Sequence, residues 1–263
     1  MKVAVLITGQ LRDYQVNALN QIKHLIEPNN ADVFVYACNK NTLHTTGNKT
    51  TQKYAITTVQ AAEEIEADVK QIYGESLKGI QVNEAEELDD SNFGTLGYFR
   101  KRMQNQMNNI RNGYLMAMEY AAARDFEYDV IVRSRPDNSI YPNPIDLKTF
   151  RLNDGLIHST RFYTGWADPW FFAFGTPETF DTYCSFQYME GEDDARTDND
   201  FLCPERAMER YLPKENIFLR YHVDICLPFT GFDKEAPIRE FPYRNESAQL
   251  IDRNGNKVVP KLK

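Results

Sequence analysis

The sequence DVIVRSRPDN, residues 129–138, joins a buried strand directly to a charged corner. Residues 130–132 are three consecutive β-branched residues, which is typical of a strand that is covered on both faces of a sheet. The run then ends in two arginines, a proline and an aspartate. Arginine is costly to bury unless it is paired. The stretch therefore predicts a central strand whose carboxyl end has either a binding role or a tightly paired charge.

Outward from this strand, the preceding chain alternates between strand and helix. Residues 3–7 and 32–37 are short, β-branched and apolar, and the segment between them has helical spacing over 16–26, closed by Pro28. Apolar residues three or four positions apart then predict one face of a long helix that leads into residues 130–132. These residues are Phe99, Met103, Met107, Ile110, Tyr114, Met118 and Ala121. The order βαβ followed by αβ predicts an α/β fold with a mainly parallel sheet.

Beyond residue 138 the pattern is mixed. It predicts strands within 156–158, 167–175 and 217–229, helices over 177–188 and 204–211, and a hairpin at a C-terminal Asn-Gly. No internal repeat is visible, so we expect one α/β domain over residues 1–263.

Composition excludes several classes of protein. A net charge of −8 argues against a nucleic-acid surface, which needs clustered Lys and Arg. The four cysteines are widely spaced without a CxxC pair, which favours reduced thiols and a cytoplasmic location. The apolar run at residues 3–7 is too short for a signal peptide, and no stretch approaches a membrane span. Neither HExxH nor GxSxG occurs, which removes zinc-protease and α/β-hydrolase functions.

The first predicted strand end is a candidate ligand site, because ligands of open parallel sheets lie at the carboxyl ends of strands. It consists of Thr8, Gly9, Gln10 and, two residues later, Arg12. Gly9 lets a backbone approach a ligand, Gln10 can bond a base or ribose, and Arg12 can pair with diphosphate oxygens. The alternative is an ordinary strand-to-helix turn with a surface arginine, and a single glycine does not decide between them.

The second strand end is the charged corner at residues 133–138. Arg133 and Arg135 are two positions apart and so point to the same side of the strand. They can hold phosphate oxygens as a fork, while Asp137 binds a divalent cation that bridges the same phosphates. The alternative is an Arg–Asp ion pair that closes the rim of the sheet.

Acidic residues of the second half give further candidates. Asp168 lies in an aromatic run, and aromatic rings beside a carboxylate are a common way to hold sugars. Asp198, Asp200 and Glu205 are candidate general bases for an acceptor hydroxyl. The alternatives are a core strand with a turn Asp168, and a solvated acidic loop with Glu205 capping a helix.

Uncharged polar residues supply two other features. Gln104 and Asn108, four positions apart on the long helix, can present amides to a ligand or simply face solvent. Residues 39–53 form a long polar stretch, which we interpret either as a lid or as a disordered segment.

Together these motifs resemble a known family. A strand running into T-G-Q-L-R, a long helix with Gln104, and Y-D-V-I-V-R-S-R-P-D are similar to bacterial and viral glycosyltransferase-like proteins. This group is similar to GT-A-fold sugar transferases and includes the WavE type of lipopolysaccharide-synthesis proteins. Residues 166–175 and the Pro-Glu at 204–205 also match in character, and the likeness covers residues 3–212 in pieces.

The resemblance implies a Rossmann-like GT-A fold, a nucleoside diphosphate-sugar donor, a glycan or surface-polysaccharide acceptor, and a Mn or Mg ion. Asp137 stands where the family has its metal-binding D-x-D motif. The first acid of that motif is absent, because position 135 is Arg. Either one carboxylate holds the ion, or the arginines do the same electrostatic work on the leaving diphosphate.

The main hypothesis is accordingly a glycosyltransferase with a nucleotide-binding half (1–138), an acceptor-side half (139–232) and a C-terminal extension with a hairpin (233–263). Asp200 or Glu205 serves as base if the anomeric centre is inverted, and Asp168 touches a sugar. One rival is a nucleotide- or glycan-binding module that has the fold without turnover, which the missing acid favours. Another is an interaction protein in which Arg135 and Asp137 are merely structural.

Overall fold

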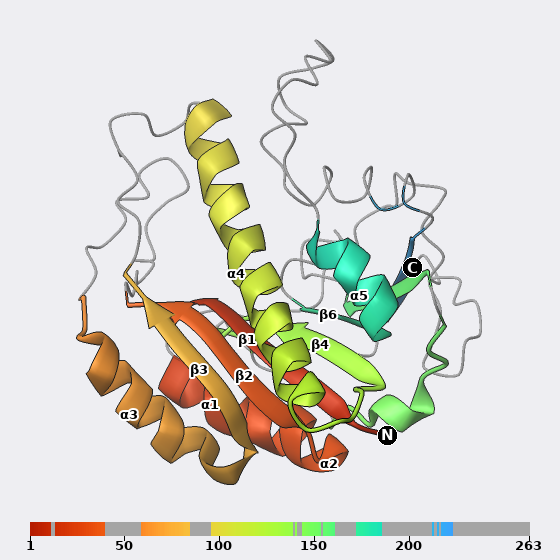
Figure 1. The fold of residues 1–263 in the computed structure, drawn as a ribbon, viewed down its shortest axis with the longest axis horizontal. Helices are drawn as coiled ribbons and strands as arrows, with labels where there is room; N and C mark the ends of the chain where they lie inside the picture. The colour runs from red at the N-terminus through yellow and green to blue at the C-terminus, as the bar shows by residue number, and fades with distance from the viewer. Residues whose placement is uncertain are drawn as a thin grey trace, which may run out of the picture.

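The computed structural model contains a seven-stranded mixed sheet with strand order β3-β2-β1-β4-β6-β5-β7 (Figure 1). The structure describes residues 1–11, 14–39, 59–84, 96–138, 140, 144–153, 155–160, 172–185, 212, 215 and 217–222. The strands are β1 (Val3–Gln10), β2 (Asp32–Cys38), β3 (Leu77–Asn83), β4 (Val130–Ser134), β5 (Leu156–Thr160), β6 (Phe172–Gly175) and β7 (Phe218–His222). Among these described strands, only β6 is antiparallel to its neighbours, β4 and β5. The predicted α/β class with a mixed, mainly parallel sheet flanked by helices is confirmed.

Helices cover both faces of the sheet. They are α1 (Tyr14–Gln21), η1 (Ile22–Ile26), α2 (Glu27–Asn29), α3 (Ala62–Tyr73), η2 (Gly74–Ser76), α4 (Leu96–Ala122), η4 (Leu147–Thr149) and α5 (Pro177–Cys184). Alternate residues of β1 enter two separate cores, as the period of a strand requires. Val3, Val5 and Ile7 pack with residues of α1 and α3, whereas Ala4 and Leu6 pack with residues of α4 and α5. Figure 1 shows α4 and α5 on the near face, with α1 and α2 behind the sheet.

The long amphipathic helix predicted around residues 99–121 is α4. Met107, Ile110, Tyr114 and Ala121 are buried on its inner face, as the spacing predicts. The helix lies close to the sheet at Gly113, where an added Cβ would stand 2.9 Å from Thr8 Cγ2. Figure 1 shows its N-terminal half extending past the sheet edge, so α4 runs beside the carboxyl ends of β1 and β2.

The prediction that Pro28 ends the first helix is wrong. The α-helical turns of α1 give way to a π-helical segment, η1, and the helix continues without a break into α2, because Gln21, Ile26 and Glu27 all keep right-handed helical angles. Pro28 has no N–H for the carbonyl four residues earlier, that of His24, and this carbonyl accepts instead from the Ile145 N–H at 2.7 Å. The helix ends instead at Asn30, whose φ of 47° makes it a left-handed cap.

The second half builds the far side of the sheet. The strands predicted around 156–158 and 167–175 are present as β5 and β6, and a strand within the predicted 217–229 range is present as β7. Helix α5 starts at Pro177, as predicted, behind Thr176, whose Oγ1 accepts a hydrogen bond from the Thr179 N–H. The predicted helix at 204–211, the C-terminal hairpin and most of the 39–53 segment lie outside the described residues.

No helix in the described part of the chain has the length and apolar character needed to cross a membrane.

Candidate functional site

The strand order places the two predicted ligand-binding strand ends side by side. The chain adds β2 and then β3 on one side of β1, and α4 then carries it across to β4 on the other side. Helix α1, which follows β1, and α4, which precedes β4, cover opposite faces of the sheet. From the carboxyl end of β1 the chain goes to β2 on one side, and from that of β4 it goes to β5 and β6 on the other. These two strand ends are therefore the topological switch point, which is where open α/β sheets bind ligands.

Gly9 lies at the end of β1 in a conformation that requires glycine. Its φ is 120°, a region that side-chain-bearing residues rarely adopt. No described atom lies within 4 Å of a Cβ built at Gly9, so backbone conformation rather than close packing requires the glycine there. The next residue, Gln10, is partly exposed and ends the strand. Both predicted residues therefore lie at the switch point.

Arg133 and Thr8 form a buried contact across β1 and β4. The Arg133 Nε donates to Thr8 Oγ1 at 3.3 Å, and each residue is 1% exposed. Arg133 is among the largest fully buried side chains of the protein. Both were predicted to bind the nucleotide, and the structure brings them together, but below the surface. Both side chains are therefore inside the protein, where Thr8 holds the arginine.

Arg135 and Asp137 form an ion pair at the rim. Arg135 Nε donates to one Asp137 carboxylate oxygen at 2.7 Å, and its Nη2 donates to the other at 2.5 Å. The two side chains are 17% and 7% exposed. This bidentate pairing is the rim-closing alternative that the sequence left open, and it also places a partly exposed guanidinium beside the ends of β1 and β4.

The turn that carries this pair is closed by backbone and side-chain bonds. The Asn138 N–H donates to the Arg135 carbonyl at 3.2 Å, with Pro136 at the second position, where its fixed φ is favoured. Asn138 Nδ2 also donates to Ser134 Oγ at 3.3 Å. The corner is thus a defined turn.

A buried side-chain amide of α1 is hydrogen-bonded to the backbone of this turn. Gln21 is 0% exposed, and its Nε2 donates to the carbonyls of Arg135 at 2.8 Å and Asn138 at 2.9 Å. Sequence reasoning missed this residue. A signal was present, because Gln21 interrupts the apolar stripe formed by Ala18 and Leu25, and a polar residue in such a stripe needs a buried partner.

The arrangement around Asp137 does not fit a divalent cation. Both carboxylate oxygens accept from the Arg135 guanidinium, whose positive charge would repel a metal ion at the same place. Within the described ranges, three or more His, Cys, Asp or Glu residues nowhere gather as a metal site. We therefore derive no chemical step through a cation on Asp137.

Of the other predicted residues, only Gln104 and Asn108 are in the described part of the chain. Gln104 is partly exposed on α4, and its Nε2 donates to Asn108 Oδ1 at 3.0 Å. Arg12, Asp168, Asp200 and Glu205 are outside the described residues.

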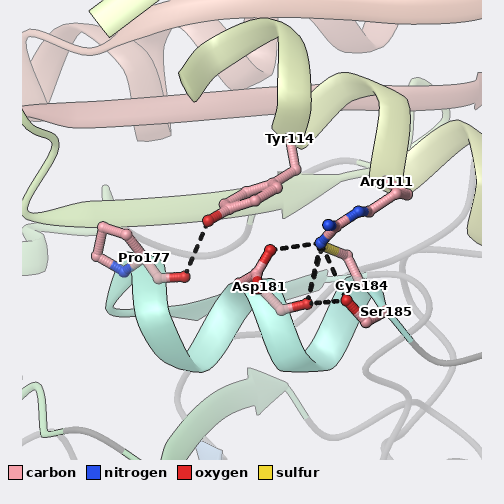
Figure 2. Close-up of polar contacts among 6 residues, drawn as sticks. All are labelled: Arg111, Tyr114, Pro177, Asp181, Cys184 and Ser185. Atoms are coloured by element: carbon pink, nitrogen blue, oxygen red, sulfur yellow. Dashed lines mark hydrogen bonds and ion pairs between the residues drawn. The ribbon is translucent and has the colours of Figure 1, made fainter. Parts of the chain in front are cut away.

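A second polar cluster joins α4 to α5 (Figure 2). The Arg111 Nη1 donates to the carboxylate and the carbonyl of Asp181, to Cys184 Sγ and to Ser185 Oγ, and the Tyr114 hydroxyl donates to the Pro177 carbonyl. A cation at the last turn of α5 also complements the partial negative charge of a helix C-terminus. Burial raises the pKa of Cys184 to about 12, so this thiol stays neutral and unreactive. We interpret the cluster as structural.

No family model and no curated protein sequence matches this chain.

Proposed function

We propose that the switch point between β1 and β4 binds a nucleoside diphosphate-sugar, and that the protein is a glycosyltransferase with a Rossmann-like, GT-A-like fold. The observation that carries the proposal is that Gly9, Arg133 and Arg135 lie at or near the adjacent carboxyl ends of β1 and β4, from which the chain leaves to opposite sides. Sites of this kind bind phosphates next to a glycine at the end of the first strand. The acceptor is a glycan or surface polysaccharide.

Arg135 is the residue to which we assign the diphosphate contact. It is partly exposed and held in place by Asp137, so its guanidinium is oriented before the ligand arrives. Planar guanidinium groups match phosphate oxygens in geometry and charge. Arg133 is buried next to Thr8 and adds a fixed positive charge beneath the proposed diphosphate site.

The electrostatic role in catalysis then falls to these arginines. Transfer of the sugar leaves a nucleoside diphosphate, and the negative charge that develops on it is stabilised by positive groups already in position. Asp137 acts in this scheme as the partner that orients Arg135. Asp200 or Glu205 remains our prediction for the base that deprotonates the acceptor hydroxyl, and Asp168 for a sugar contact.

The test is calorimetric binding and donor hydrolysis across UDP-, GDP-, CMP- and dTDP-sugars, with and without Mn²⁺ or Mg²⁺. We expect one nucleotide class to bind and Arg135→Ala to weaken it about tenfold to a hundredfold, since charge-assisted hydrogen bonds contribute ~1.5–3 kcal/mol. Arg124→Ala is the matched control. It removes an equal charge from the loop that precedes β4, where Arg124 lies over the Tyr120 ring. Absence of nucleotide binding by the folded wild-type protein overturns the proposal.

A non-catalytic nucleotide-binding module is the second candidate, and the Arg135–Asp137 pair favours it. Both oxygens of the Asp137 carboxylate accept from the Arg135 guanidinium, so they are not available to bind the metal that a metal-dependent enzyme would need. The distinguishing result is nucleotide-sugar binding with Arg135 dependence but no sugar release under any metal condition. This candidate is rejected if the wild-type protein releases sugar and if Arg135→Ala lowers both sugar release and nucleotide binding.

A further inference from the structure

We infer that Gln21 is a positioning residue for the diphosphate site, acting through the turn 135–138. The inference rests on the proposed function and adds to it a residue on α1 that touches no ligand. Its side chain bonds to both ends of the turn that carries Arg135 and Asp137, across 114 and 117 positions of sequence.

The hydrogen-bonding capacity of the Gln21 amide is well matched to this place. Its two N–H groups donate to the carbonyls of Arg135 and Asn138, and its Oε1 accepts from the Tyr73 hydroxyl at 3.5 Å. A primary amide has two donors and one acceptor oxygen, so donors and acceptor are all used. Burial raises the pKa of Tyr73, which keeps that phenol protonated as a donor.

The anchored carbonyls bracket the functional part of the turn. The Arg135 carbonyl also accepts from the Asn138 N–H, so one Gln21 amide fixes the first and last residues of a four-residue turn. Asp137 lies between these two anchored carbonyls, and the Arg135 side chain leaves the chain directly before the first of them. A shift of the turn would therefore move both charged groups, and small displacements of binding groups are costly to a preorganised site.

The helix geometry around Gln21 is also unusual. The π-helical segment η1 starts at the next residue, and π-helical turns are frequent at functional sites.

Asn29 is a second buried amide on the same helical stretch, and it can be compared with Gln21. Its Nδ2 donates to the Leu25 and Ile145 carbonyls, and its Oδ1 accepts from the Leu147 N–H. Asn29 thus performs the same kind of anchoring for a segment without site residues.

The experiment compares Gln21→Met with Asn29→Leu as its matched control. Each variant removes a buried amide and keeps most of the side-chain volume. Binding of the nucleoside diphosphate that the wild type selects from UDP, GDP, CDP and dTDP is measured by calorimetry, and stability by thermal melting. We expect Gln21→Met to weaken binding about tenfold, because the orientation of a charge-assisted contact is lost. Asn29→Leu should lower the melting temperature and change affinity less than about twofold.

Epistasis with Arg135 separates positioning from general destabilisation. In an Arg135→Ala background, Gln21→Met should no longer weaken binding, although its effect on melting temperature persists. Hydrogen exchange of the peptide that contains residues 135–138 should rise in Gln21→Met and not in Asn29→Leu. If Gln21→Met does not fold, Tyr73→Phe removes only the bond to Oε1 and should weaken binding about twofold to fivefold.

Two failures are distinguishable. Wild-type protein that binds no nucleoside diphosphate overturns the proposed function, and this inference with it. Wild-type binding that Gln21→Met leaves unchanged, or an effect that adds fully to that of Arg135→Ala, overturns the inference alone.

Discussion

The close approach of α4 to β1 gives a prediction that combines two substitutions, Gly113→Ala and Thr8→Ser. A Cβ at position 113 would lie 2.9 Å from Thr8 Cγ2, 3.6 Å from Tyr36 Cβ and 3.9 Å from Leu6 Cβ. The first distance is well below an ordinary carbon contact of ~3.5–4.0 Å. Thr8 is β-branched and 1% exposed, so its methyl group has little room to move.

The magnitude follows from two opposing terms. Overpacking a buried site costs ~1–3 kcal/mol, while replacing glycine by alanine within a helix stabilises by ~1 kcal/mol. The net expectation for Gly113→Ala is a loss of ~0–2 kcal/mol. Thr8→Ser removes the methyl group that collides and keeps the hydroxyl that accepts from Arg133. Its own cost is ~1 kcal/mol for one buried methyl.

The assay is a double-mutant cycle by thermal melting, in which 1 kcal/mol corresponds to ~2–4 °C for a chain of this size. Because Thr8→Ser removes the clash, the double variant should be ~1–3 kcal/mol more stable than the sum of the single effects predicts. Gly79→Ala is a useful comparison, since its Cβ would meet the flexible end of Met116 as well as the Phe34 ring, and Thr8→Ser should not affect it. Simple additivity at positions 113 and 8 would refute the packing argument.

Three further predictions concern the rest of the described structure. Arg111→Met should lower stability by ~1–2 kcal/mol, because the variant loses a cation that bonds Asp181 and Cys184 of α5 and the adjoining Ser185. Chemical denaturation measures the loss, and Lys70→Met, which loses an exposed ion pair within α3, is the comparison. A comparable loss in both variants would contradict the role given to Arg111. Cys184 should resist alkylation at pH 8 in the folded protein and react after unfolding, because burial raises its pKa to about 12, and peptide mapping by mass spectrometry reads this out. Burial and the hydrogen bond to Asp68 raise the pKa of Tyr14 from 10.0 to about 12, so the protonated phenol is favoured in the folded state. Its contribution to stability is present below pH 10 and lost as pH rises toward 12, and Tyr14→Phe should flatten that part of a stability–pH curve.

The sheet could be predicted from sequence where local pattern decides the structure. The β-branched runs at 3–7 and 130–132 and the helical spacing up to Ala121 report burial directly, and β1, β4 and α4 follow from them. The pattern failed at Pro28, because the helix continues past it and the unpaired His24 carbonyl accepts from the distant Ile145 N–H. Local spacing carries no sign of that tertiary contact.

The site was partly predictable for a related reason. The charged ends of β1 and β4 were visible, but their adjacency depends on the chain crossing from β3 to the far side of β1, which no local pattern specifies. Burial depth is likewise a tertiary property: Arg133 is covered, whereas Arg135, two residues later, reaches the rim. The anchoring by Gln21 depends on contacts more than 100 positions apart.

We propose that the protein binds a diphosphate at the rim formed by Gly9 and Arg135. A crystal structure of the protein with a nucleoside diphosphate would show whether it does. We predict phosphate oxygens within hydrogen-bonding distance of the Arg135 guanidinium and beside the Gly9 backbone, over the buried Arg133. A nucleotide bound elsewhere, with the Arg135–Asp137 pair unchanged and no phosphate near β1 or β4, would contradict the account.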